Sequence, residues 1–490
     1  MVSIIFPFLI RTVMIRSLGI EYLGINNLFA SILSVLSLAE LGFGSALVFS
    51  MYRPIAEDNT ETICALMNFY KNCYRVIGLV VLTLGLLLLP FIRCFVKSEL
   101  PPDINLYAVY LLTLFTTVMT YFLYSYKNSL LIAFQRVDVS SKISLVLLTI
   151  QYLLQAILLI LFRNYYFYMV IAPAVNILTN VITAMAVSRL YPEYKPDGKI
   201  SCRERGEIIK KVKALVTYKI GNVVSNAVDN IVISSFLGLV ILAKYNNYYY
   251  VITALFSLLS VYYSSITAGI GNGLVRNSRS DNYQLFHLLY VIQIWLVGWM
   301  SICMLCLYQP FMGLWGRLSG ENISLPMGIV ICFVLYFYTW KINDIVHIYK
   351  EAAGMWEYDR WRPFIASLFN LTLNLFLVNK VGLYGVILST VFTELLFSIW
   401  AVYPLFHYYF EKRIWDYYKW LMEYTLFYLA VGMITFWICG TVAGDGLSAL
   451  LLKGLICVLI PNLLFLGIVK WTGNEAAIHW LLDKMSCRSK

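Results

Sequence analysis

The sequence contains very little charge for its length. Only 13% of its 490 residues are Asp, Glu, Lys or Arg, whereas 60% are hydrophobic. A soluble chain of this size would have to present far more charge to water. No stretch is both long and polar enough to form a separate soluble domain. The composition therefore excludes a soluble protein and indicates a membrane protein.

The sequence also lacks the motifs of several enzyme classes. There is no G-x-x-x-x-G-K-[ST] motif, which excludes an ATP site of that type. The glycines at 269–273 follow no strand pattern, so they do not form a dinucleotide loop. The chain has 4 His, in separate segments and without H-E-x-x-H spacing. We therefore expect no enzyme and no catalytic residue.

Cysteine is scattered rather than arranged in motifs. Of the 10 Cys, only Cys303 and Cys306 form a Cys-x-x-Cys pair, and they lie inside an apolar run. In that setting we expect buried free thiols rather than a redox or zinc pair. The sequence thus predicts no metal and no cofactor, apart from a coupling proton or sodium ion discussed below.

What the chain does contain is a series of apolar runs of about 18–25 residues, the length of a transmembrane helix. They predict an all-α polytopic membrane protein with about 14 transmembrane helices. We place these near residues 2–18, 25–50, 66–92, 105–131, 143–162, 166–188, 215–236, 247–273, 285–307, 325–349, 363–379, 383–406, 421–441 and 449–470.

The distribution of basic residues gives the orientation. The net charge of +11 would suit a nucleic-acid partner, but Lys and Arg concentrate in alternate short loops. This is the pattern of the positive-inside rule, so we expect no nucleic acid and a multi-pass protein of the plasma (inner) membrane. Both termini should be cytoplasmic. The first apolar run lacks a basic start and an A-x-A-like site, so we expect no cleavable signal peptide.

The most charged loop, 189–214, contains Pro192 and Pro196 and is the natural midpoint. It predicts four parts: a six-helix lobe (1–188), a basic cytoplasmic linker (189–214), a second six-helix lobe (215–406), and helices 13 and 14 with a tail (407–490). A weak repeat supports the division. Residues 17–27 resemble 236–247, and 41–48 resemble 268–275.

A polar stripe interrupts the apolar run that follows the linker. Its members are spaced by three, four and three residues, which places them on one helix face: Lys219, Asn222, Asn226 and Asp229. Such a stripe is costly in lipid, so it should face other helices or a wet cavity. The alternative is that Lys219 and Asp229 extend to the membrane surfaces while the two Asn join helices.

Other helices of both halves carry polar residues too. They include Arg11, Arg16, Glu40, Tyr121, Ser125, Lys127, Asn128, Gln151, Gln155, Asn176, Asn180, Thr183, Asp344, His347, Glu351, Asn370, Asn374 and Glu394. Each alone is explained by ordinary hydrogen bonds between helices. Their presence on both halves favours a shared hydrophilic cavity. Arg and Lys suit a diphosphate, and amides and aromatic rings suit a sugar.

Several segments resemble a known family. They are Arg16-Ser-Leu-Gly through Glu21-Tyr-Leu-Gly, residues 38–59, Asp229-Asn-Ile-Val-Ile through Phe236-Leu-Gly, Tyr245-Asn-Asn-Tyr, and Gly269-Ile-Gly-Asn. In these the chain resembles Wzx-type flippases for lipid-linked oligosaccharides. They form the polysaccharide transporter branch of the superfamily that also contains the MATE exporters and the lipid II flippase MurJ.

The resemblance implies two six-helix lobes around a central cavity, with two extra C-terminal helices outside them. The cavity would open alternately to either side and carry an undecaprenyl diphosphate-linked repeat unit outward, for O-antigen, capsule or exopolysaccharide. By position, Arg16 matches the Arg before the family's Leu-Gly, and Asp229 matches an acidic residue of its seventh helix. Implied partners are the lipid-linked substrate, membrane lipids, and the polymerase and glycosyltransferases of the pathway.

We therefore predict a lipid-linked oligosaccharide flippase. Arg11, Arg16 and Lys219 would hold the diphosphate. Asn222, Asn226 and Asp229 would line the sugar-facing wall. Asp229, Asp344 and Glu394 are the candidates for coupling to a proton or sodium gradient.

Two other functions stay open at this point. A MATE-like, cation-coupled exporter of small molecules would need a net acidic cavity. A membrane-embedded glycan polymerase or acyltransferase would need a large outer loop, and the sequence contains none.

Overall fold

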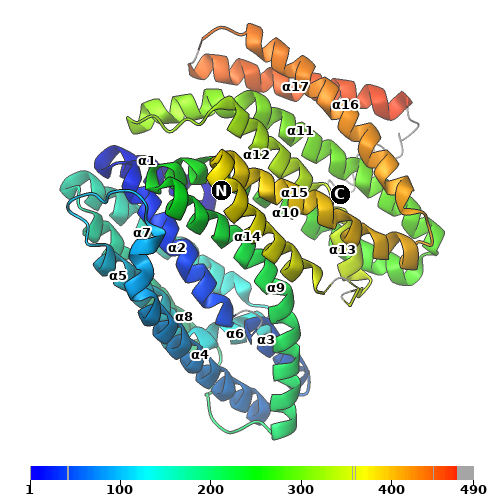
Figure 1. The fold of residues 1–490 in the computed structure, drawn as a ribbon. Helices are drawn as coiled ribbons and strands as arrows, with labels where there is room; N and C mark the ends of the chain where they lie inside the picture. Colours follow the sequence, from blue (N-terminus) through cyan, green and yellow to red (C-terminus); the bar gives the residue numbers. More distant parts are fainter. Residues whose placement is uncertain (1, 41–42, 356, 359, 445, 472–490) are drawn as a thin grey trace. The chain divides into compact units, whose positions relative to one another are not determined.

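The computed structural model describes residues 2–40, 43–355, 357–358, 360–444 and 446–471, and within these ranges the chain is helical, without strands (Figure 1). The elements are α1 (Val2–Leu18), α2 (Ile20–Leu36), η1 (Ser37–Glu40), α3 (Phe43–Ala56), α4 (Thr60–Leu88), η2 (Leu89–Phe95), α5 (Leu106–Phe122), α6 (Ser125–Ala133), α7 (Val137–Phe162), α8 (Tyr165–Leu190), α9 (Cys202–Leu237), α10 (Leu239–Arg276), α11 (Arg279–Ser319), α12 (Met327–Lys341), α13 (Asp344–Ala352), α14 (Arg362–Val381), α15 (Leu383–Pro404), η3 (Leu405–Tyr409), α16 (Ile414–Thr441) and α17 (Leu447–Trp471).

The apolar runs of the sequence account for these helices. Among the described residues, 10 helices are long and apolar enough to cross a membrane, and 11 if α5 and α6 form one bent span. Each predicted segment overlaps at least one helix. The all-helical membrane fold is therefore confirmed, whereas the count of 14 spans stays a prediction.

Three predicted spans are interrupted. The run 25–50 is divided into α2, η1 and α3, and 325–349 is divided into α12 and α13. The run 105–131 is divided into α5 and α6, which are bent by 55°. At this bend Tyr124 has a φ of 56°, a left-handed conformation that ends the regular helix. Hydropathy averaged over a whole span does not show such breaks, because the span as a whole stays apolar.

The chain forms two compact units. Unit 1 comprises Met1–Ala243, Ser319–Glu321 and Pro363–Leu371, and unit 2 comprises Lys244–Leu318, Asn322–Arg362 and Thr372–Lys490. Helix α9 packs against α2 and belongs to unit 1. The predicted lobe boundaries remain predictions.

The basic segment 189–214 is only partly a loop, because α9 begins at Cys202 within it. Ser201 caps this helix: its hydroxyl accepts from the Glu204 N–H at 3.2 Å, and its own N–H donates to the Glu204 carboxylate at 3.0 Å. These contacts form a capping box. Hydrogen bonds from the Ser201 side chain and backbone lower the pKa of Glu204.

Within unit 1, α7 and α8 pack along each other, as do α4 and α5, and α5 also contacts α8 (Figure 1). Helices α2 and α9 approach closely beside the start of α10. A Cβ on Gly24 of α2 would stand 2.9 Å from the backbone carbonyl carbon of Leu239. Such small residues at helix contacts allow backbones to approach.

The two repeat segments contain equivalent turns. Gly19 separates α1 from α2 with φ 117° and ψ 165°, and Gly238 separates α9 from α10 with φ 93° and ψ 173°. Only glycine adopts this region without strain. The repeated Leu-Gly pair therefore encodes the same sharp joint at the start of each half.

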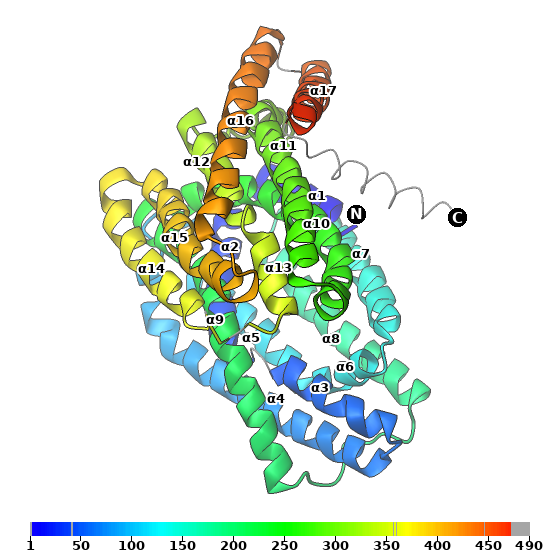
Figure 2. The same ribbon diagram turned by 90° about the vertical axis from the view of Figure 1, so that its right-hand side faces the viewer.

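The core of unit 2 is aromatic and centred on α11. Phe286 and Tyr290 of α11 pack with Tyr349 of α13, Phe406 of η3 and Tyr417 of α16. Helices α16 and α17 lie side by side, as Figure 2 shows. Helix α17 is also bonded to α11, where the Trp295 and Trp299 indoles donate to Asn462 Oδ1 at 2.7 Å and to the Cys457 carbonyl at 2.9 Å.

We predict that Gly24→Ala lowers the free energy of unfolding by about 1–3 kcal/mol, because the added methyl meets backbone that cannot move aside. The midpoint of thermal unfolding, followed by tryptophan fluorescence in detergent, measures this. Gly206→Ala is the matched control, since Gly206 lies on α9 of the same unit with nothing within 4 Å of its Cβ position. Equal midpoints for the two variants would contradict the close packing.

Candidate functional site: a polar cavity in unit 1

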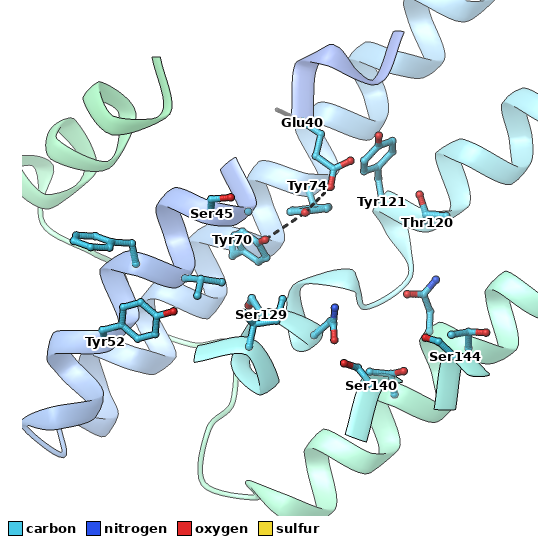
Figure 3. Close-up of a pocket in the computed structure, with 18 residues that line it drawn as sticks. Glu40, Ser45, Tyr52, Tyr70, Tyr74, Thr120, Tyr121, Ser129, Ser140 and Ser144 are labelled. Atoms are coloured by element: carbon cyan, nitrogen blue, oxygen red, sulfur yellow. Dashed lines mark hydrogen bonds between the residues drawn. The ribbon is translucent and has the colours of Figure 1, made fainter. Parts of the chain in front are cut away.

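Unit 1 contains a cavity of about 690 Å³ whose walls come from η1 and helices α3 to α8 (Figure 3). Most of its lining residues carry a hydroxyl, an amide or a carboxyl group. These are Glu40, Ser45, Tyr52, Tyr70, Tyr74, Thr120, Tyr121, Asn128, Ser129, Ser140, Ser144, Thr179, Asn180 and Thr183. Gly44, Val48, Phe49 and Ile132 complete the lining.

The cavity lies where two helices of unit 1 are interrupted. Glu40 is the last residue of η1, and Thr120 and Tyr121 are near the end of α5, just before its bend into α6. Irregular backbone at membrane depth is tolerated where it lines a wet cavity or is buried in protein. Interrupted helices are also where transporters build their binding sites. The location of the cavity therefore follows from the breaks.

The carboxyl of Glu40 is linked to the hydroxyl groups of two tyrosines. The Tyr74 hydroxyl donates to Glu40 Oε1 at 2.8 Å, and the Tyr70 hydroxyl lies 3.3 Å from that of Tyr74. The two tyrosines are four residues apart on α4, so they share one helix face, as Figure 3 shows. Gly44 leaves room for them, because a Cβ there would stand 3.2 Å from the Tyr70 hydroxyl.

The chemistry of the lining is polar but almost uncharged. Among the described lining residues, Glu40 carries the only carboxyl group, and none is Lys or Arg. Among the described residues, the buried Asn128 Oδ1 has no hydrogen-bond partner. Lys127, the neighbour of Asn128, is bonded to α8, with Nζ 2.6 Å from Ser188 Oγ. Hydroxyl and amide groups beside tyrosine rings suit a ligand rich in hydroxyl groups.

The predicted orientation would place this cavity toward the cytoplasm. The lining residues come from η1 and much of α3, from the first half of α4, from the end of α5, from α6 and the start of α7, and from the second half of α8. Under the orientation set by the basic loops, all these helix ends are cytoplasmic.

Arg11 and Arg16, which the sequence analysis predicts to bind the diphosphate, lie in unit 1 but outside the cavity. Arg11 of α1 reaches Asn27 of α2, with Nη2 3.5 Å from Oδ1. Arg16 is exposed at the end of α1. Neither residue lines the cavity. Their predicted role in binding a diphosphate is not tested by this arrangement and stays a prediction.

Asp229 is buried in α9, with 5% of its surface exposed. Its neighbour Asn230 donates from Nδ2 to Ser31 Oγ of α2 at 2.8 Å. The predicted place of Asp229 in the sugar-facing wall and in ion coupling stays a prediction. The side chains of Lys219, Asn222 and Asn226 are outside the described part of the structure.

The predicted coupling residues of unit 2 lie near the break between α12 and α13. Asp344 Oδ2 is 2.9 Å from Lys341 Nζ, and these side chains are only 17% and 13% exposed. Gln293 of α11 donates from Nε2 to the Lys341 carbonyl at 2.5 Å and to the Tyr263 hydroxyl at 2.7 Å. Glu394 is half-buried on α15. The break thus holds a buried ion pair that the spacing of three residues permits.

Sequence analysis identified part of the cavity without assembling it. It singled out Glu40, Tyr121, Asn128, Asn180 and Thr183 as polar residues of apolar helices but assigned none of them to the site. It missed the tyrosine pair of α4 and the two serines of α7. The available signal was their spacing of four residues, which repeats on neighbouring helices (Tyr70 and Tyr74, Ser140 and Ser144).

We predict that the buried pair Lys341–Asp344 is costly to break on one side only. Lys341→Met alone should lower the free energy of unfolding by about 3–5 kcal/mol, because it leaves Asp344 buried and unpaired. The double variant Lys341→Met/Asp344→Leu should recover most of this loss. Thermal unfolding in detergent measures both variants.

The control for this experiment is Lys419→Met, which removes an exposed pair with Glu423 on α16 of the same unit. It should cost no more than about 1 kcal/mol. If the double variant is as unstable as Lys341→Met, the pair is not the cause. If the double variant is stable but inactive in transport, Asp344 acts in coupling as well as in packing.

Comparison with known proteins identifies the fold. Residues 1–268 match the family model described as polysaccharide biosynthesis protein. The structure of lipid II flippase MurJ in an inward closed conformation matches with a TM-score of 0.67 at 16% identity, covering 95% of this chain and 97% of that chain.

Two transporter structures are similar as well. An inward-facing multidrug resistance MATE family transporter of the MOP superfamily has a TM-score of 0.62 at 13% identity, covering 81% and 92% of the two chains. A Vibrio cholerae MATE transporter has a TM-score of 0.52 at 14% identity, covering 82% and 93%. No curated protein matches the chain by sequence.

At these identities the structural likeness establishes the fold, and the family match covers more than half of the chain. The expected resemblance to the MATE and MurJ superfamily is confirmed, and so is the expectation of a membrane transporter fold rather than an enzyme. The chain belongs to the polysaccharide biosynthesis protein family, and its fold is similar to that of the MurJ and MATE transporter structures.

Proposed function

We propose that this protein is a flippase that moves an undecaprenyl diphosphate-linked oligosaccharide from the cytoplasmic to the outer face of the plasma membrane. The cargo would serve the synthesis of a surface polysaccharide: O-antigen, capsule or exopolysaccharide. The movement occurs by alternating access, in which the site opens first to one side and then to the other. The family match and the MurJ-like fold support this class of function.

The observation that carries the proposal is the lining of the unit 1 cavity. A sugar chain offers many hydroxyl groups and few charges. The described lining can form hydrogen bonds with these hydroxyl groups through its own hydroxyl and amide groups, which surround a single carboxyl. Tyr52, Tyr70, Tyr74 and Tyr121 add ring faces, against which sugar rings pack. A volume of about 690 Å³ holds a few sugar units, in keeping with a glycan entering from the cytoplasmic side.

The diphosphate needs a different kind of site. Its charge would be met by Arg11 and Arg16 of α1 and by Lys219 of α9, while Asn222, Asn226 and Asp229 continue the sugar-facing wall. Guanidinium groups bind phosphate oxygens in a bidentate manner, which suits a headgroup held at one depth. The contact between α1 and α2 at Arg11 and Asn27 places one of these cations among polar neighbours.

Energy would come from a proton or sodium gradient, with Asp229, Asp344 and Glu394 as the coupling candidates. Asp344 beside Lys341 is a pair whose strength changes when the carboxyl gains a proton or a cation. We further propose that both termini are cytoplasmic. Partners would be the polymerase and glycosyltransferases that act on the same lipid-linked glycan.

Deletion of the gene tests the function directly. We expect a complete lipid-linked repeat unit to accumulate on the cytoplasmic face and the surface polymer to disappear. Lipid-linked glycans labelled from each face of the membrane, in spheroplasts and inverted vesicles, give this measurement. A repeat unit that still reaches the outer face would refute the flippase.

Substitutions in the cavity test the site. Tyr74→Phe and Glu40→Gln should each lower export about tenfold at normal protein level, because the first removes the hydrogen bond to the Glu40 carboxyl and the second replaces that carboxyl with a neutral amide. Glu61→Gln is the matched control, since Glu61 is exposed at the start of α4 and does not line the cavity. Arg16→Ala, Lys219→Ala and Asp229→Asn test the second group. If all three preserve export, those residues do not hold the cargo.

One observation favours the MATE-like alternative. Of the lining residues that the structure describes, only Glu40 carries a carboxyl group, which would attract a small organic cation. In that case the deletion strain would keep its surface polymer and become sensitive to cationic drugs. Glu40→Gln would then abolish drug resistance without changing lipid-linked glycans.

A further inference from the structure

Unit 2 gathers cysteines that are far apart in the sequence. Cys306 comes from α11, Cys439 from α16 and Cys457 from α17, and all three are buried. Their sulfur atoms all lie within 4.8 Å of one another. Cys439 Sγ and Cys457 Sγ are 3.9 Å apart. Cys303, one turn before Cys306 on the same face of α11, is a further neighbour of Cys457.

Contacts other than those of the thiols fix this arrangement. The Trp299 indole donates to the Cys457 carbonyl at 2.9 Å, and Trp295 donates to Asn462 one turn further along α17. These two bonds set the register of α17 against α11. Helix α16 packs against α17 and so brings Cys439 beside Lys453 and Cys457. The Cys439 Sγ lies 3.9 Å from the Lys453 carbonyl. The cluster is thus a consequence of well-bonded helices.

The spacing fits a metal ion. With Zn–S bonds of about 2.3 Å, two sulfurs of a tetrahedral site are about 3.8 Å apart. The Cys439–Cys457 separation of 3.9 Å is close to this value, and the other two separations among Cys306, Cys439 and Cys457 need shifts of no more than about 1 Å. Cys303 lies outside this group of three, so its side chain would have to move closer to complete a site with four ligands. A disulfide would instead require about 2.05 Å between the two sulfurs.

The groups around the cysteine cluster can balance the negative charge of bound thiolates and give the released thiol protons a route to water. A cavity of about 540 Å³ touches Cys306 and Cys439, and its lining includes Arg317 and Lys453. Thiols lose their protons when they bind a metal, and this cavity gives the protons a route to water. Lys453, whose carbonyl lies 3.9 Å from Cys439 Sγ, brings a positive charge that would offset part of the negative charge of metal-bound thiolates. An apolar core without such groups would disfavour the site.

We propose that Cys306, Cys439 and Cys457, with Cys303 as the fourth ligand, bind one thiophilic d10 metal ion, Zn²⁺ or Cu⁺. Thiolate ligands select these ions. The bound ion joins α16 and α17 to α11 and so attaches the C-terminal hairpin to the rest of unit 2. Sequence analysis expected free thiols here, because the positions of Cys439 and Cys457 relative to Cys303 and Cys306 cannot be seen in one dimension. This site is independent of the transport proposal.

The first test is the metal content of the full chain, purified in detergent under argon and measured by mass spectrometry of the elements. We expect about one Zn or Cu per chain, and which element is found decides between the two ions. Cys457→Ser should lower the content at least fivefold. Cys332→Ser should not change it, since Cys332 is a buried thiol on α12 of the same unit outside the cluster.

A second test does not depend on the folding of any variant. Wild-type protein stripped with a chelator and reductant is titrated with CdCl₂, and the ultraviolet charge-transfer band of cadmium thiolate is recorded. Saturation at one Cd²⁺ per chain supports the site. A wild-type chain without stoichiometric metal that also gives no such band overturns it. So does a Cys439–Cys457 disulfide in the native protein, found by mass spectrometry without reduction.

Discussion

In the hydrocarbon interior every backbone N–H and C=O must find its partner within the protein. This constraint makes the chain helical and gives meaning to each place where a helix stops inside the membrane. The breaks between η1 and α3, between α5 and α6, and between α12 and α13 coincide with Glu40, with Thr120 and Tyr121, and with the Lys341–Asp344 pair. Ionisable and hydroxyl groups are thus concentrated where the backbone itself is irregular.

The helix breaks of the two units have different surroundings. In unit 1 the break opens onto a polar, nearly uncharged cavity that can accommodate a ligand. In unit 2 the break is closed by an ion pair, with Gln293 bonded to the Lys341 carbonyl. The flippase proposed above would need both a surface that tolerates varied sugars and a switch that responds to an ion. Under that proposal the hydroxyl-lined wall would serve the first need without strong binding, and the paired carboxyl would serve the second.

Much of the fold could be predicted because long apolar runs in the sequence indicate membrane helices. The Leu-Gly repeat even indicated the joints at Gly19 and Gly238, whose matching conformations only glycine allows. The breaks could not be predicted, because nothing in the sequence around Tyr124 specifies its left-handed backbone conformation. The cavity could be predicted only in part. Glu40 and Asn128 are conspicuous in an apolar helix, but Tyr70 and Tyr74 resemble the many tyrosines of the membrane interface.

Polar residues on one helix face were read as a cavity wall, yet such a face also serves where two helices meet. Asp229 is buried on α9, its neighbour Asn230 bonds Ser31 of α2, and Arg11 bonds Asn27 between α1 and α2. Under the proposed alternating access these contacts would have to change, because helices that close one side of the membrane must part to open it. A polar contact separates at lower cost than an apolar one if water replaces the lost hydrogen bonds. The Asn230–Ser31 contact is therefore suited to a surface that would be dry in one state of the proposed cycle and wet in the other.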